Sequence, residues 1–320
     1  MTKISLYQCV IIVAKRVVIS LINAINVRLQ LIATRHVKRS TDTNIKKNAR
    51  KFSDVLPRST EINDEVAAHA AKLHDLALFK EPPPSQYGDC PICFLQMPLL
   101  NSGHRYKGCC GKVICVGCAH APVYDHLGII VTKKVCPFCR TPAPETDEEA
   151  NERDMVRVEA GDPIAIQDLG YNYREGTEGR PQDYTKAFEL YLRAGKLGSS
   201  EAYNNIGYLY DFGFGVEEDE KKAIHYYELA AMGGCAVARY NLGIKEMKAF
   251  NEVRALKRFM IAVRGGDANA LKKIKMYYKY GYATKEDYMK ALQSYQAYLG
   301  EIKSKQRDEA AAADDQYRYY

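Results

Sequence analysis

The C-terminal half of the chain repeats one pattern of small and aromatic residues. A small residue is followed four positions later by an aromatic one, and three positions after that by a second small one, as in Ala187, Tyr191 and Ala194. Further copies are Ala223, Tyr227 and Ala230, and Ala255, Phe259 and Ala262. A fourth copy, Ala291, Tyr295 and Tyr298, has tyrosine in place of the second small residue. Residues spaced three and four apart share one face of a helix. Each copy is therefore predicted to be a helix with one apolar stripe.

A second helix is predicted before each stripe. It carries an aliphatic residue followed by glycine in Leu169-Gly170, Ile206-Gly207 and Leu242-Gly243, with Ile274 in the fourth copy. Glycine inside a helix costs about 1 kcal/mol, so its recurrence indicates that a neighbouring helix approaches closely. One helix pair cannot bury its own stripe. The pairs are therefore predicted to stack into a solenoid, with the tyrosines mostly in its core.

The best copy, residues 206–234, resembles the Sel-one-like repeat, a relative of the tetratricopeptide repeat. The resemblance covers about 159–300, and it weakens where unit three lacks four turn residues and where Lys275 replaces glycine in unit four. It implies an adaptor that holds protein partners on the concave face. The segment before Gly161 is expected to cap the N-terminal end of the stack.

Other patterns divide the rest of the chain. Residues 59–79 have mixed helical spacing and are followed by the sequence EPPP, which ends the predicted helix. Thr146 and Glu149 match a capping box at the start of another helix. The expected parts are a basic apolar extension (1–51), a helix and Pro-rich linker (52–86), a cysteine-rich module (87–144), an acidic linker or capping helix (145–160), the solenoid (161–300) and a polar tail (301–320).

Charge is concentrated at one end of the chain. The formal net charge is +7, but residues 1–51 alone carry eleven Lys and Arg against one acid, Asp42, which leaves the remainder at −3. A basic, nucleic-acid-binding body is therefore not supported.

The apolar start does not favour a membrane span. Lys15 and Arg16 divide the first 32 residues into two short apolar runs, whereas a span takes about 20 apolar residues. We expect a dispensable extension, with an organelle-targeting segment and a membrane anchor or signal as alternatives. The expected compartment is otherwise the cytoplasm or nucleus.

Eight of the ten cysteines lie close together between residues 90 and 139. They are Cys90, Cys93, Cys109, Cys110, Cys115, Cys118, Cys136 and Cys139. A C-x-x-C step points two thiolates at one centre, which is typical of zinc rather than of a disulfide framework. Four sulfurs leave no open position for water, so the expected zinc ions are structural.

The spacing, with CPIC first and CPFCRTP last, resembles a RING finger over about 87–142. The resemblance implies two structural zinc ions. The first would be held by Cys90, Cys93, Cys115 and Cys118, and the second by Cys109, Cys110, Cys136 and Cys139. The expected fold class is mainly α, with a small zinc-stabilised RING module followed by an α/α helical-repeat solenoid.

The second zinc site is open to a different interpretation. Many RING fingers have a histidine where this chain has Lys112, and a charged lysine cannot bind zinc. Cys109 supplies an eighth sulfur, and we prefer two complete sites over one defective site. His104 is the next-best substitute ligand, and His120 and His126 are weaker ones.

The RING resemblance also implies residues for ubiquitin transfer. Ile92 and Pro137 match positions that contact a ubiquitin-conjugating enzyme, and Arg140 matches the linchpin that bridges this enzyme and ubiquitin. The third contact, on a helix, is expected at Val123, Tyr124 or Leu127. We expect a ubiquitin ligase with protein substrates on the solenoid. The alternatives are a non-catalytic zinc adaptor and, less favoured, a nucleic-acid-binding zinc protein.

Overall fold

The computed structural model describes residues 59–79, 87–99, 103–121 and 135–313, together with 315 and 318. The chain divides into two compact units, Met1–Leu78 and Phe79–Tyr320. In the first unit, helix α3 (Ser59–Leu78) confirms the predicted helix. The expected N-terminal extension lies outside the described residues. No helix of the described segments is long and apolar enough to cross a membrane.

The cysteine module is built on a short hairpin followed by one helical turn. Strand β1 (His104–Lys107) pairs antiparallel with β2 (Lys112–Cys115), and α4 (Val116–His120) follows at once. Two isolated bridges, Asp89 with Gln96 and Val135 with Pro142, close the loops that carry the first and last cysteine pairs. Each pair is thereby presented on a tight turn.

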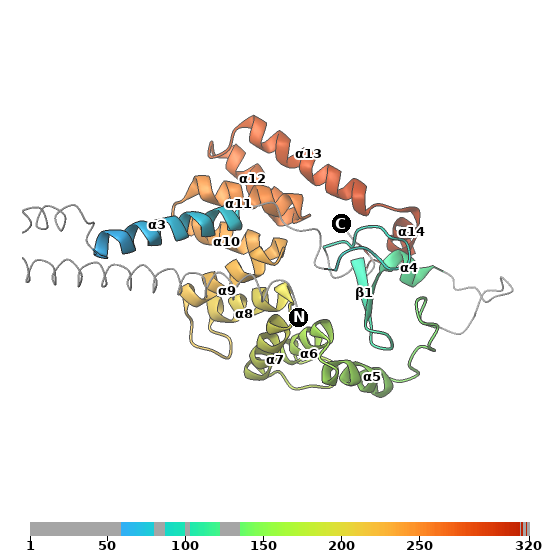
Figure 1. Ribbon diagram of the computed structural model, residues 1–320. Coiled ribbons are helices and arrows are strands. Elements are labelled where there is room, and N and C mark those ends of the chain that lie inside the picture. The colour runs from blue at the N-terminus through green and yellow to red at the C-terminus, as the bar shows by residue number, and fades with distance from the viewer. Residues whose placement is uncertain are drawn as a thin grey trace, which may run out of the picture. The chain divides into compact units, whose positions relative to one another are not determined.

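The second unit continues as a stack of paired helices, as the repeat pattern predicts (Figure 1). The pairs are α6 (Pro163–Glu175) with α7 (Tyr184–Lys196), α8 (Ser200–Phe212) with α9 (Glu220–Met232), α10 (Ala236–Lys248) with α11 (Glu252–Arg264), and α12 (Ala268–Lys279) with α13 (Lys285–Ile302). The mainly helical fold class is confirmed.

The small and aromatic residues pack as predicted in the first three pairs. Tyr191, Tyr227 and Phe259 are almost fully buried. Each ring lies over the glycine of the preceding helix, so that a Cβ on Gly170, Gly207 or Gly243 would come within 3.0 Å of it. Close contact between the helices therefore requires these glycines. The packing that they allow outweighs their cost in helix propensity.

The fourth pair departs from this arrangement. Tyr298 is buried, whereas Tyr295 is only half-buried. The ring of Tyr298 covers Gly266, where a Cβ would lie 2.2 Å from it, and its hydroxyl accepts a hydrogen bond from the Leu99 N–H at 2.8 Å. The end of the solenoid thus contacts the cysteine module.

Helix α5 (Asp147–Glu159) precedes the stack and packs on α6, with Val158 buried. Its N-cap, Thr146, accepts the Glu149 N–H at 3.2 Å. The predicted capping box is only half formed, because the Glu149 carboxylate accepts the Glu145 N–H at 2.9 Å instead of that of Thr146.

The segment expected as a polar tail, 301–320, contains helix α14 (Lys305–Ala313). This helix packs against α4 of the cysteine module, and its Arg307 and Ala310 are buried. The pattern gave no sign of this, because α14 has almost no apolar stripe. Figure 1 shows the module between α5 and α14, the helices that precede and follow the solenoid.

We predict that Gly207→Ala destabilises the solenoid by about 1–3 kcal/mol, because the new Cβ would lie 2.6 Å from the buried Tyr227 ring. Chemical unfolding followed by helical circular dichroism measures this change. The matched control is Gly300→Ala at an exposed position of α13 with no atom within 4 Å of its Cβ. It should stabilise by about 0.5–1 kcal/mol. Equal effects at the two glycines would contradict the packing role.

Candidate metal centre

The first sulfur group joins segments on both sides of the hairpin. Cys90 and Cys93 come from the first loop, Cys115 ends β2 and Cys118 lies in α4. Their four Sγ atoms lie within 4.8 Å of one another, and those of Cys93 and Cys115 are 3.7 Å apart. The residues are the four expected for the first zinc site, and we call this group site one.

The second sulfur group lies at the opposite end of the hairpin. Cys109 and Cys110 occupy the turn between β1 and β2, and Cys136 and Cys139 come from the last loop. The Sγ atoms of Cys110 and Cys136 are 4.0 Å apart, and those of Cys109 and Cys139 are 3.5 Å apart. Both adjacent cysteines thus face the same centre. We call this group site two.

Both groups have the dimensions of a tetrahedral zinc site. Zn–S bonds of about 2.3 Å in tetrahedral geometry place sulfurs about 3.8 Å apart, and the three Sγ–Sγ distances given above run from 3.5 to 4.0 Å. The residues present therefore fit two metal ions, each with four sulfur ligands. Such an ion would act as a structural cross-link, since four ligands close its coordination shell.

Hydrogen bonds around the sulfurs favour their charged form. The Cys115 N–H donates to Cys90 Sγ at 3.5 Å, and the Cys118 N–H donates to Cys115 Sγ at 3.4 Å. In site two, Thr141 Oγ1 lies 3.1 Å from Cys139 Sγ. Hydrogen bonds to the ligand sulfurs orient the ligands and tune a metal site.

Without a cation, the thiols of one group do not all ionise together: the hydrogen bond from Cys115 lowers the pKa of Cys90, whereas the pKa values of Cys115 and Cys118 are raised. Burial and then the charge of Cys90 raise the pKa of Cys118 to about 12. Burial also raises the pKa of Cys110. Four such thiols ionise together only when a cation shares their charge, and a divalent metal ion supplies it.

The alternative ligands lie elsewhere. His104 belongs to neither sulfur group, and its ring centroid lies 4.4 Å from that of Tyr87. His120 ends α4 outside both groups, and His126 is not among the described residues. The Lys112 ammonium lies 6.0 Å from the centre of the Phe138 ring. The all-cysteine set therefore best describes site two.

The residues expected to contact a conjugating enzyme lie beside the sulfur groups. Ile92 and Pro137 are half-buried, and Ile92 packs against the small apolar core of the module. Arg140 is exposed, has a φ of 64° and donates its N–H to the Cys136 carbonyl at 2.9 Å. The expected helical contacts, Val123, Tyr124 and Leu127, lie outside the described residues.

Charged and aromatic side chains attach the module to the solenoid. Arg157 of α5 donates to the carbonyls of Gly108 and Cys109 at 2.8 and 2.7 Å. The Tyr106 hydroxyl donates to Asp162 at 2.8 Å, and burial raises the pKa of Tyr106 far above its usual range. The turn that carries Cys109 is therefore fixed from the solenoid side, which the cysteine spacing could not reveal.

A cavity of about 500 Å³ lies between the module and helices α6, α8 and α10 of the solenoid. The Glu201 carboxylate spans it by accepting hydrogen bonds from Tyr87 at 2.7 Å and from Gln167 at 2.9 Å. Amide and tyrosine side chains from both sides line it: Tyr87, Tyr106, Gln167, Tyr171, Asn204 and Asn205. These groups can hydrogen-bond an extended peptide backbone.

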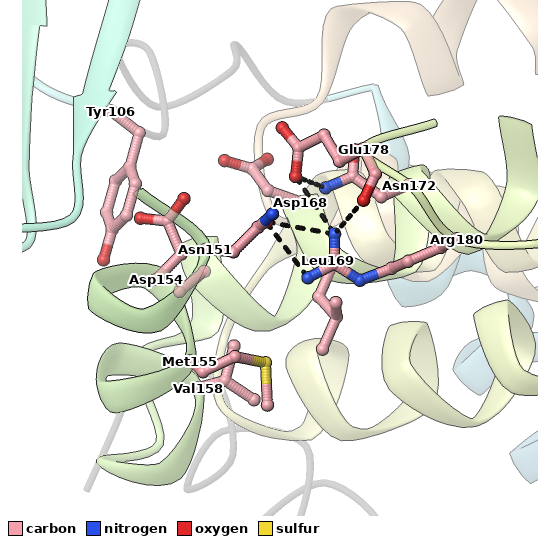
Figure 2. A pocket seen from close by; sticks show the side chains of 11 residues that line it. Tyr106, Asn151, Asp154, Met155, Val158, Asp168, Leu169, Asn172, Glu178 and Arg180 are labelled. Atoms are coloured by element: carbon pink, nitrogen blue, oxygen red, sulfur yellow. Dashed lines mark hydrogen bonds and ion pairs between the residues drawn. The ribbon is translucent and has the colours of Figure 1, made fainter. Parts of the chain in front are cut away.

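A smaller pocket lies between β1, α5 and α6. Figure 2 shows Tyr106 at one end and the ion-paired Glu178 and Arg180 at the other, with Nη1 of Arg180 and Oε2 of Glu178 3.2 Å apart. Asp168 lines both this pocket and the larger cavity. Asp168 is exposed to solvent, but protein atoms surround its carboxylate closely. This burial and then the charge of Glu201 raise the pKa of Asp168 to about 7.

Comparisons with known proteins bear on the helical half. Residues 163–199 and 200–235 match the model of the Sel1 repeat. These segments correspond to α6–α7 and α8–α9, so the predicted Sel1-like repeats are confirmed.

Curated relatives are similar to part of the chain. The ERAD-associated E3 ubiquitin-protein ligase component HRD3B of Arabidopsis thaliana is 30% identical over 128 residues, which are 40% of this chain and 19% of that protein. Protein sel-1 homolog 2 of Mus musculus is 36% identical over 70 residues, or 22% of this chain and 10% of that protein. The chain thus spans less than a fifth of the length of either relative.

Among solved structures, a Sel1 repeat protein from Oxalobacter formigenes is 29% identical, with a TM-score of 0.43. The match covers 55% of this chain and 68% of that chain.

We predict two zinc ions per chain, falling to one in Cys109→Ser because site two loses a ligand while site one is intact. Metal analysis combined with native mass spectrometry measures the number. His104→Ala is the matched control and should keep both ions. Two ions retained in Cys109→Ser, or one lost in His104→Ala, would contradict the all-cysteine ligand set.

Proposed function

We propose that the chain is a RING-type ubiquitin ligase in which the helical repeats recruit protein substrates. The observation that carries the proposal is the crossed grouping of the cysteines. The first and third pairs form one group and the second and fourth pairs form the other, with each group at one end of the β1–β2 hairpin. This is the cross-braced order that the RING resemblance implies.

The proposed chemistry is positioning rather than covalent catalysis. Closed four-sulfur sites offer no reactive position on the metal. The module would hold the ubiquitin-charged conjugating enzyme through Ile92 and Pro137, while the Arg140 guanidinium hydrogen-bonds across to ubiquitin. Its planar fork of donors suits such bridging. Holding a thioester in a reactive geometry accelerates transfer without any protein nucleophile.

The cavity between module and solenoid supports substrate recruitment. Its polar and aromatic lining fits an extended polypeptide segment, and it lies against the module that would present the charged conjugating enzyme. A segment bound there is thereby kept close to the transfer site, which raises its effective concentration. In this proposal the solenoid supplies substrate choice and the module supplies the charged enzyme.

A non-catalytic adaptor is the second candidate. It is favoured by the relative HRD3B, whose name describes a component of an E3 ubiquitin-protein ligase and whose similarity spans 128 residues of this chain. In that case the chain would join a ligase assembly through its repeats, and the sulfur groups would only stabilise the module.

The two candidates differ in what Ile92→Ala and Arg140→Ala do. In the ligase, each change should reduce ubiquitin-chain formation by up to about 100-fold, because the thioester loses its fixed orientation. Discharge of ubiquitin from a panel of charged conjugating enzymes, with the purified full chain, measures this rate.

The control variant is Lys221→Ala at an exposed position of α9, which should retain the wild-type rate. Zinc content checks that every variant keeps an intact module. A zinc-loaded wild-type chain that shows no activity across the panel would exclude the ligase and leave the adaptor.

A further inference from the structure

Arg307 of α14 is the largest side chain with no solvent exposure among the described residues. Its guanidinium donates to the Gln96 carbonyl at 2.9 Å, to the Leu95 carbonyl at 3.4 Å and to the Ile302 carbonyl at 2.5 Å. Two of these acceptors belong to the loop directly after Cys93. A residue from the end of the chain therefore fixes the loop that begins site one.

The charge of this guanidinium needs compensation. A buried and unpaired charge is strongly destabilising, and no carboxylate of the described segments forms an ion pair with Arg307. The sulfur of Cys93 lies 4.0 Å from its Nη2. A zinc ion with four thiolates carries a net charge of −2, so a metal-loaded site one supplies the missing negative charge.

The backbone of the module is shaped to receive α14. Gly117 lies between the ligands Cys115 and Cys118. A Cβ at this glycine would come within 2.8 Å of the backbone nitrogen of Arg307. The Cys118 sulfur lies 3.9 Å from Gln306 Oε1. Helix α14 is thus seated directly on the second ligand pair of site one, in contact that only glycine permits.

We propose that helix α14 contributes to metal binding at site one. Arg307 is the positioning residue, which neutralises and orients the thiolates of this site. Metal binding and docking of α14 are then coupled, and the coupling is reciprocal. Docked α14 slows the loss of metal from site one, and bound metal keeps α14 in place. This inference rests on the proposed zinc binding but not on ubiquitin transfer.

The test uses the full chain carrying Cys139→Ser, in which site one alone keeps four sulfurs. Transfer of zinc to a chromogenic chelator gives the release rate. Arg307→Gln should accelerate release by about 10- to 100-fold, the range for loss of a group that contacts a metal ligand. Arg307→Lys should recover part of the difference because it keeps the positive charge. Lys305→Gln, on the same helix with its side chain 90% exposed, is the matched control and should not change the rate.

A second measurement needs no substitution. Hydrogen exchange of the wild-type chain should show faster exchange at residues 305–313 after zinc removal than before it. An unchanged release rate in Arg307→Gln, or unchanged protection of α14 in the metal-free chain, would overturn the coupling. Neither measurement involves ubiquitin, so the coupling and the ligase proposal stand or fall separately.

Discussion

The cysteine module depends on contacts among cysteine sulfurs from turns that lie far apart in the sequence. Its two strands have only four residues each, and its apolar core among the described residues is formed largely by Met97, Val113, Ile114 and the cysteines of site one themselves. So little apolar area cannot offset the entropy of ordering the loops. A structural zinc ion contributes roughly 10–16 kcal/mol of folding free energy. The module is therefore expected to take its shape from the metal.

The solenoid rests on a different constraint, the close approach of helices at glycine. Each of the first three pairs buries an aromatic ring against the glycine of the preceding helix. In the last pair the Tyr298 ring covers Gly266 instead, and its hydroxyl accepts a hydrogen bond from Leu99 of the module. Arg157 of α5 and Arg307 of α14 add hydrogen bonds to the cysteine loops, so the helices on both sides of the solenoid also fix the module. The two proposed functions, presenting a charged enzyme and choosing a substrate, would then share one folded unit.

The sequence was informative where a local period or spacing decides the structure. The stripe of Ala187, Tyr191 and Ala194 predicts its helix and its buried face, and the resemblance to a RING finger implies which sulfurs meet. It was uninformative where the contact joins residues far apart. Arg307 and Gln96 are separated by 211 positions. Helix α14 has almost no apolar stripe, so its sequence pattern does not predict that it is buried. The half-formed capping box at Thr146 failed for a local reason, since Glu149 has a competing donor at Glu145.

The most direct test of the central claim is zinc-edge X-ray absorption of the purified full chain. The structure and the donor set predict two zinc ions per chain, each with four sulfur neighbours at about 2.3 Å and no nitrogen or oxygen ligand. A folded chain without metal, a shell that includes nitrogen, or cysteines joined as disulfides would contradict the account.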